Sequence, residues 1–212
     1  MPVPTKPKIY HILHVDRLAS VVSNGCLWSD SEVQRRDPAG TTIGMSGIKQ
    51  RRLATPLGSH PDLYVGDCVP FYFCARSVML YVIYMANHPE LAYRGGQDPV
   101  VHLEADFHQA VNWADRHDRR WAFTESNAGS NYFADYCDLA NLNEINWTAV
   151  EARDWRKCQE HKQAEFLVER SFPWTLFRRV GVRTQSVRRR VQEAIGNVAH
   201  QPKVEIMPNW YY

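Results

Sequence analysis

Short apolar runs separated by polar, glycine- and proline-containing stretches run along the whole chain. Residues 9–13 predict a first strand, and Asp16 is placed to cap a short helix that Gly25 ends, with a second strand after it. Further apolar runs bounded by turn residues predict strands over 70–74, 99–103, 164–169, 176–182 and 203–207.

Helices are predicted where apolar residues follow a capping residue or recur at helical spacing. Ser77 precedes an apolar run over 78–85 that suits a core helix. Other helical patterns cover 107–113, 147–155 and 186–195. Because the strands and helices do not alternate regularly, the sequence predicts an α+β fold rather than a doubly wound sheet. The 212 residues fit a single domain, 1–212, with one site.

Two long polar stretches interrupt this pattern. Residues 29–60 are rich in Gly, Pro and Arg, and residues 124–146 are rich in Asn, Ser and Asp. Loops of this length usually carry function or lack order. The first stretch is therefore predicted to be mobile or ordered by a ligand.

Composition limits the functional class and the compartment. Lys and Arg number 25 against 23 Asp and Glu, so attraction to nucleic acid has to come from local clustering. The 5 cysteines are never spaced as CxxC, which argues against a disulfide framework or a zinc knuckle and favours a reducing cytoplasm. The start lacks an apolar signal segment, and the most hydrophobic stretch, 71–86, contains Arg76, so neither export nor a membrane span is predicted.

Glu165 is the first candidate for chemistry. Strand alternation puts Glu165 on the same side as Leu167 and puts Phe166 on the other side. Spacing alone favours an exposed glutamate on an edge strand. A carboxylate on a rigid strand beneath a polar loop can instead stabilise an oxocarbenium-like sugar cation or accept a proton.

The pair Arg51 and Arg52 suits bidentate recognition of a diphosphate, although a solvated basic turn is the commoner outcome for such a pair. Neither GxGxxG nor GxxxxGK[ST] occurs in the sequence, which argues against an ordinary dehydrogenase or NTPase. His11 and His14 flank the end of the first strand. They lack partner ligands at metal spacing, so an acid–base, ligand-binding or packing role stays open and no metal is predicted.

Basic and aromatic residues near the C-terminus suggest contact with nucleic acid. The arginines lie at 178, 179, 183 and 188–190, and a helix would spread the last group around its surface, so some of them must be ordinary solvated charges. Aromatic residues at 132, 133, 136 and 210–212 can stack unpaired bases, and the terminal group can alternatively pack against the core.

Motifs spread over the chain resemble the DarT family of DNA ADP-ribosyltransferases. Each motif is weak alone, whereas their order and spacing are specific to that family. They are YHILH (10–14), NG (24–25), QRR (50–52), VPFYFC (69–74), GGQ (95–97), KQAEFLV (162–168) and WYY (210–212).

The resemblance implies a single-domain ADP-ribosyltransferase fold with central mixed β-sheets and peripheral helices. It implies a toxin that transfers ADP-ribose from NAD, without a metal, to a thymidine base in a sequence-specific motif of single-stranded DNA and releases nicotinamide. A macrodomain antitoxin of the DarG type is the implied partner. We expect a cytoplasmic monomer. Acceptors left open are guanosine in DNA, RNA and protein, and a non-catalytic nucleic-acid-binding module is the remaining alternative.

The resemblance also assigns residues. Its catalytic pair falls on Glu165 and Arg52, and its NAD contacts are His11, Ile12, Leu13 and Arg52, with Ser20 and Trp28 aligned by spacing only. An NAD-covering segment would span about 34–55, and a substrate-recognising loop about 127–165. Some relatives have histidine where this loop has Asn127, so the base-positioning role of that residue and the preferred DNA motif stay open.

Overall fold

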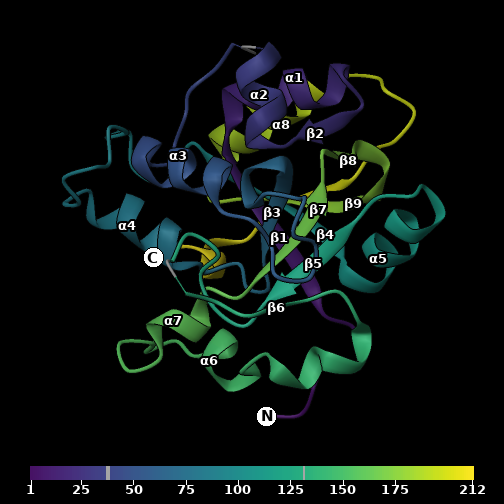
Figure 1. Cartoon of the computed structure of the whole chain (residues 1–212). Coiled ribbons are helices and arrows are strands. Elements are labelled where there is room, and N and C mark those ends of the chain that lie inside the picture. Colours follow the sequence, from purple (N-terminus) through teal and green to yellow (C-terminus); the bar gives the residue numbers. More distant parts are fainter. Residues whose placement is uncertain (37–38, 131) are drawn as a thin grey trace.

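An eight-stranded sheet forms the centre of a computed structural model that describes residues 1–36, 39–130 and 132–212 (Figure 1). The strand order is β10-β9-β4-β1-β3-β7-β5-β6. β10 is parallel to β9 and the other neighbours are antiparallel, so the sheet is mixed. Its strands are β1 (Lys8–His14), β3 (Cys68–Tyr72), β4 (Val100–Asp106), β5 (Trp121–Thr124), β6 (Asp135–Tyr136), β7 (Glu165–Glu169), β9 (Phe177–Val182) and β10 (Lys203–Ile206). A separate two-stranded sheet pairs β2 (Cys26–Trp28) with β8 (Ser171–Pro173).

Helices surround the sheet, as the sequence predicts for an α+β fold. They are α1 (Leu18–Ser23), α2 (Asp30–Arg36), α3 (Ser46–Ala54), α4 (Val78–Met85), α5 (Phe107–Arg116), α6 (Trp147–Glu151), α7 (Gln159–Lys162) and α8 (Gln185–Ile195). In the described parts of the chain, every helix is too short or too polar to cross a bilayer.

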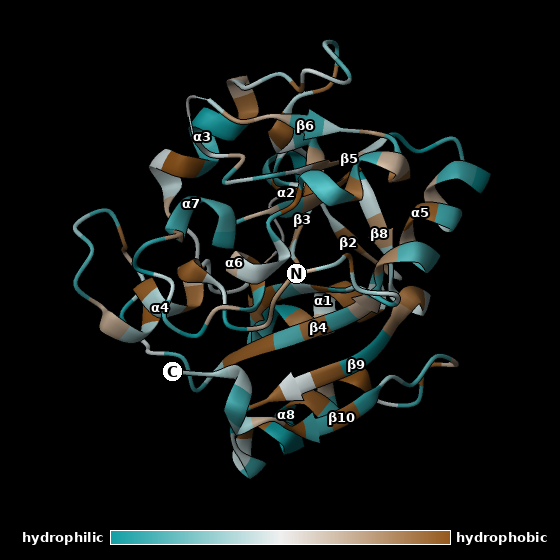
Figure 2. Cartoon of the chain, turned by 90° about the horizontal axis from the view of Figure 1, so that it is seen from below, coloured by the Kyte–Doolittle hydropathy of each residue, from teal (hydrophilic) through white to brown (hydrophobic). Residues whose placement is uncertain are grey.

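Two cores lie on opposite faces of β1. Ile9 and Leu13 join the larger core, to which α1, α5 and α8 contribute, whereas Ile12 joins a smaller core with α4 and the chain end. The alternation of β1 produces this division because successive side chains of a strand point to opposite faces. Figure 2 shows the hydrophobic residues concentrated in the strands, with amphipathic α5 and α8 at the periphery.

Local signals place several element ends correctly. The Ser77 hydroxyl accepts a hydrogen bond from the Leu80 amide at 3.2 Å, which confirms it as the cap of α4. Gly25 follows α1 with φ of +67°, a conformation that glycine adopts without strain. Asp16 is not a cap, contrary to prediction. β1 runs into a 3-10 turn over Val15–Arg17, and the Asp16 carboxylate accepts from the Thr41 amide and hydroxyl instead.

The polar stretch 29–60 contains two helices, where the sequence predicts a mobile or ligand-ordered segment. Glu32 of α2 is 3% exposed and forms ion pairs with Arg35 and Arg36 of the same helix. It also pairs with Arg170, which links α2 to the end of β7. These contacts depend on partners that a local hydrophobic pattern does not reveal. Residues 37 and 38 of this stretch lie outside the described residues.

The sheet opens between β1 and β3. β1 pairs with β4 from Lys8↔Asp106 to His14↔Val100, but it pairs with β3 only at Tyr10↔Tyr72. Beyond that position no further backbone pairs join the two strands. Residues of both strands line the candidate site there.

Candidate active site

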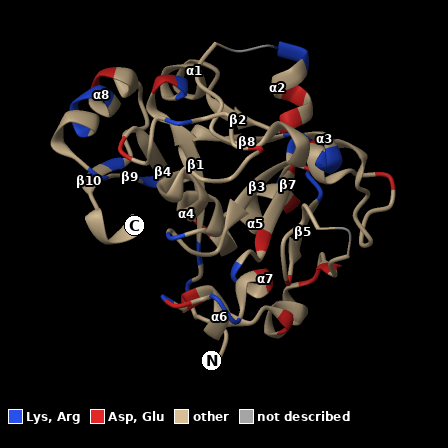
Figure 3. Cartoon of the chain, turned by 90° about the vertical axis from the view of Figure 1, so that its left-hand side faces the viewer, with Lys and Arg blue, Asp and Glu red and all other residues tan. Residues whose placement is uncertain are grey.

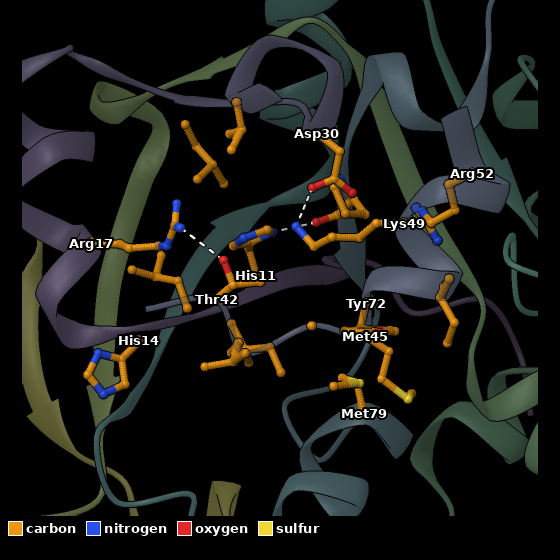
Figure 4. Close-up of a pocket in the computed structure, with 18 of the residues that line it drawn as sticks. His11, His14, Arg17, Asp30, Thr42, Met45, Lys49, Arg52, Tyr72 and Met79 are labelled. Atoms are coloured by element: carbon orange, nitrogen blue, oxygen red, sulfur yellow. Dashed lines mark hydrogen bonds and ion pairs between the residues drawn. The ribbon is translucent and has the colours of Figure 1, made fainter. Parts of the chain in front are cut away.

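A cavity of about 250 Å³ occupies the opening beside the end of β1 (Figure 4). Met45, just before α3, and Met79 of α4 contribute to its wall, and β3 contributes Tyr72. Most of its lining surface is apolar, and polar and charged side chains are distributed around it, a composition that suits a polar small molecule. The cavity is the main candidate for the nucleotide site.

The cavity wall contains every residue that the resemblance assigns to catalysis or NAD. They come from β1, α1, β2, α3 and β7, which are far apart in the sequence. These residues are His11, Ile12, Leu13, Ser20, Trp28, Arg52 and Glu165. The fold therefore brings the predicted set together, and the roles of its members stay predictions.

One face of α3 lines the cavity. Met45, just before the helix, and Ile48, Lys49 and Arg52 follow helical spacing and all line the wall. Arg51 falls on the opposite face and is exposed. Helical spacing thus separates the two neighbouring arginines and brings only Arg52 into the site.

Glu165 lies at the start of an interior strand, which corrects the expectation of an exposed glutamate on an edge. β7 lies between β3 and β5, and Glu165 is 2% exposed. Its backbone amide donates to the Thr124 hydroxyl at 3.0 Å, and its carboxylate accepts from the Ala128 amide at 3.3 Å. Phe166 packs into the larger core on the opposite face, so the predicted alternation is confirmed.

Arg52 and Glu165 form a buried bidentate ion pair. Arg52 Nη1 donates to Glu165 Oε1 at 3.0 Å, and Nη2 donates to Oε2 at 2.8 Å. Burial opposes the positive charge, but the Glu165 carboxylate outweighs it and raises the pKa of Arg52 above its usual value. The pair fixes the plane of the carboxylate and keeps the arginine protonated. A guanidinium has five N–H donors, so others remain for a ligand.

His11 presents a hydrogen-bond acceptor to the cavity. Its Nδ1 lies 2.8 Å from the Pro70 carbonyl oxygen, which can only accept, so Nδ1 carries the proton. Burial lowers the pKa of His11 from 6.5 to about 4. At neutral pH the ring is therefore uncharged, and Nε2 offers a lone pair.

Trp28 presents an unpartnered donor at the same wall. Its indole nitrogen is buried and has no hydrogen-bond partner among the described residues. The Arg36 guanidinium lies 4.1 Å from the centroid of the Trp28 ring, which holds the indole in place. A buried N–H without a partner is costly unless a ligand supplies an acceptor. The cavity therefore suits a ligand that carries both hydroxyl or amide donors and oxygen acceptors, as NAD does.

Sequence reasoning misses a polar bridge across the cavity. Asp30 of α2 accepts from Lys49 of α3 at 2.5 Å, and Arg17 donates to the Thr42 hydroxyl at 3.0 Å on the other side (Figure 4). These residues belong to no recognisable motif. The helical spacing of Lys49 with Arg52 is the signal that would have revealed one of them.

The C-terminal arginines are partly used within the fold. Arg178 donates to Gln109 at 2.6 Å, Arg179 pairs with Glu205 at 2.8 Å and Arg183 pairs with Asp98 at 2.5 Å. The aromatic residues at the chain end pack against the core, which is one of the two roles that the sequence leaves open for them. Trp210 and Tyr211 join the smaller core. Within the described residues, no group of His, Cys, Asp or Glu is arranged to hold a metal ion.

A family model described as DarT, ssDNA thymidine ADP-ribosyltransferase, matches residues 10–212. The chain belongs to the DarT family. A DNA ADP-ribosyl transferase of Thermus sp. (strain 2.9) is 34% identical over 214 residues, covering 99% of this chain and 98% of the relative. The structure of Thermus sp. 2.9 DarT in complex with ADP-ribosylated ssDNA superposes with a TM-score of 0.89 at 32% identity, covering 100% of this chain and 99% of that chain. The same DarT in complex with NAD⁺ gives a TM-score of 0.83 at 29% identity, covering 100% of both chains.

Family membership confirms the identification made from the motifs. It also confirms the fold class and the enzyme class, an NAD-dependent DNA ADP-ribosyltransferase. The catalytic interpretation is favoured over a non-catalytic nucleic-acid-binding module. Family membership does not assign the individual site residues or the segment boundaries, which stay predictions.

Proposed function

We propose that Glu165 and Arg52 are the catalytic pair of a toxin that transfers ADP-ribose from NAD to a thymidine base in a short motif of single-stranded DNA. The observation that supports this most is the buried bidentate pair in the wall of the cavity that also holds the first-strand motif. Both catalytic side chains are held rigidly, as charge stabilisation in a transition state requires.

In this proposal the nicotinamide end of NAD lies against His11, Ile12 and Leu13, and Ser20 and Trp28 are further contacts; all five residues line the cavity, which supports the arrangement. NAD supplies the glycosidic bond that ionises. The His11 Nε2 lone pair accepts a hydrogen bond from a hydroxyl or amide group, and the Trp28 indole N–H donates to an oxygen. Together these contacts fix the orientation of the sugar relative to Glu165.

The reaction follows from the charges in the cavity. The bond between ribose C1′ and the nicotinamide nitrogen breaks, and its electron pair neutralises the departing pyridinium. Positive charge develops on the ribose, where the Glu165 carboxylate stabilises it. Thymine N3 then forms the new bond to C1′ and loses its proton. Arg52 stays protonated beside Glu165, so Glu165 is the group that accepts this proton.

Two segments complete the proposed site. The NAD-covering segment, about 34–55, contains α3 with Arg52, and the substrate-recognising loop, about 127–165, ends at Glu165. The amide of Ala128 bonds to the Glu165 carboxylate, so the start of this loop is tied to the catalytic residue. Residues 37, 38 and 131 of these segments lie outside the described residues.

The proposed biology follows from the product. An ADP-ribosyl group on a base blocks pairing, so a cell that makes this enzyme needs a hydrolase to remove the group. We propose a macrodomain antitoxin of the DarG type as that partner. We also propose that the enzyme is a cytoplasmic monomer.

Mass spectrometry of oligonucleotides incubated with the enzyme and NAD tests this function. We expect one ADP-ribosyl group on single-stranded DNA that contains thymidine, and none on matched DNA without thymidine. Modification that follows guanosine instead would replace the proposed acceptor, and labelling confined to RNA or protein would reject DNA as the substrate. Point substitutions around a modified thymidine would define the sequence motif.

A further inference from the structure

A second cavity, of about 210 Å³, lies beside the first. Adjacent residues line the two cavities, with Tyr10 and Lys162 on the second and His11 and Gln163 on the first. The chain end closes the second cavity through Trp210 and Tyr212. The same segments of the chain therefore border both cavities.

The second cavity contains a buried ammonium group without a counterion. Lys162 is 3% exposed, and its Nζ donates to the Val150 carbonyl at 2.6 Å. Among the described residues no carboxylate lies within the 4.0 Å of an ion pair with it. The neighbouring Cys74 does not supply the charge, because burial raises the pKa of its thiol. Burying an unpaired charge costs free energy, and an anion bound in the cavity would pair with the Lys162 ammonium group and reduce that cost.

Other lining residues give the cavity a positive character. Arg76 and Arg153 also line it, and Glu151 is the carboxylate on the described wall. Arg76 and Lys162 come from segments that border the first cavity, and Arg153 is an exposed residue of the lining. The excess of cations suits a phosphate group, which arginine binds in a bidentate manner.

Aromatic side chains flank these cations. The Arg76 guanidinium lies 4.3 Å from the centroid of the Tyr212 ring, and the Tyr84 ring stacks on Tyr212 at 6.1 Å. Tyr84 is 51% exposed, so one of its faces remains open. Trp155 Nε1 donates to the Tyr212 hydroxyl at 3.1 Å, which holds this ring in place. Rings next to cations form the usual surface for unpaired bases and their backbone.

We propose that the second cavity binds a phosphodiester of the single strand beside the acceptor base. Lys162, Arg76 and Arg153 contact the phosphate oxygens, and the open face of Tyr84 receives a neighbouring base. The strand then continues past the segments that border both cavities, which places the acceptor base near Glu165. This proposal rests on the proposed function, because the bound strand is the acceptor DNA. Free inorganic phosphate has the same charged oxygens and is the alternative ligand of this cavity.

The test compares two double variants with the same loss of charge. Arg76→Gln with Arg153→Gln changes the second cavity, and Arg189→Gln with Arg190→Gln changes exposed arginines of α8. Figure 3 shows α8 at the opposite end of the view from α6 and α7, between which Arg153 lies. Affinity for a fluorescent single-stranded oligonucleotide is measured by anisotropy without NAD, over a series of salt concentrations. Thermal stabilisation by NAD checks that each variant is folded.

We expect the cavity variant to bind the oligonucleotide at least about tenfold more weakly, since each lost contact is a charged hydrogen bond. The slope of log affinity against log salt should flatten by about 1.4, the value for two phosphate contacts on a single strand. The α8 variant should keep the wild-type affinity and slope.

Three results would overturn the proposal. They are wild-type affinity in the cavity variant, equal losses in both variants, or thermal stabilisation by inorganic phosphate that depends on Arg76 and Arg153 while oligonucleotide affinity does not. Binding is measured without turnover, so these results are distinct from failure of the proposed function. That failure would appear as wild-type protein that binds the oligonucleotide but never adds ADP-ribose to DNA.

Discussion

Each of the two adjoining cavities contains a buried cation, and the two cations differ in their partners. Arg52 meets the Glu165 carboxylate in a bidentate pair, whereas Lys162 has one carbonyl contact and, among the described residues, no carboxylate within ion-pair distance. The first arrangement is complete within the protein and orients a catalytic group. The second is incomplete and suits an anionic ligand. The buried charge of Arg52, which is paired with a carboxylate, thus indicates catalysis in the first cavity. The buried charge of Lys162, which lacks such a pair, indicates ligand binding in the second cavity.

Removing the charge of Glu165 should have the largest effect. Glu165→Gln keeps the shape of the side chain but cannot stabilise the developing cation, so kcat should fall on the order of a thousandfold while NAD binding persists. Nicotinamide release and NAD binding are the measurements. Glu169→Gln, on the same strand but paired with Arg120, is the matched control and should keep nearly all activity. Near-normal kcat in Glu165→Gln would remove this residue from the chemistry.

Breaking the pair from the other side should cost stability in addition to activity. Arg52→Met leaves the Glu165 carboxylate buried without its counterion, which should lower the unfolding free energy by about 3–5 kcal/mol. Denaturant unfolding measures the change. The neighbouring variant Arg51→Met removes an exposed charge and should stay within about 0.5 kcal/mol of wild type. A change in Arg52→Met as small as the one expected for Arg51→Met would show that the pair contributes little to folding.

Replacing the buried cation of the second cavity by methionine should have a different effect on stability. Lys162→Met removes a buried charge that lacks a counterion and loses one hydrogen bond, so the unfolding free energy should change by no more than about 1.5 kcal/mol. Its affinity for single-stranded DNA should nevertheless fall about tenfold, the effect of one charged contact. A loss of stability as large as that of Arg52→Met, with unchanged DNA affinity, would make Lys162 structural.

A further prediction concerns the imidazole of His11, which is buried and stays neutral. Burial lowers the pKa of His11 from 6.5 to about 4, so between these values the unfolded chain binds more protons than the folded one. His102 behaves in the same way, with a pKa lowered to about 4. The unfolding free energy should therefore fall as the pH drops from 6.5 to 4. His11→Asn should reduce this slope, and an unchanged slope would show that His11 is charged or solvated in the folded protein.

The sequence predicts those parts of the fold whose signals are local. Alternation around Phe166 defines β7, Ser77 marks the start of α4, and the motif resemblance collects the residues of the first cavity. The interior position of Glu165 depends on pairing with Tyr72, which lies 93 positions away by residue number, and no local pattern reveals it. Lys162 is a similar case, because lysine is seldom buried and nothing adjacent to it predicts burial.

The proposed chemistry requires the carboxylate of Glu165 to lie beside the bond that breaks in NAD. A crystal structure of this protein with an unreactive NAD analogue tests it most directly. We expect the nicotinamide ribose in the first cavity, with a ribose hydroxyl within hydrogen-bond distance of Glu165 and the Arg52 pair intact. An analogue bound with its nicotinamide ribose away from Glu165 would show that this carboxylate does not stabilise the developing cation.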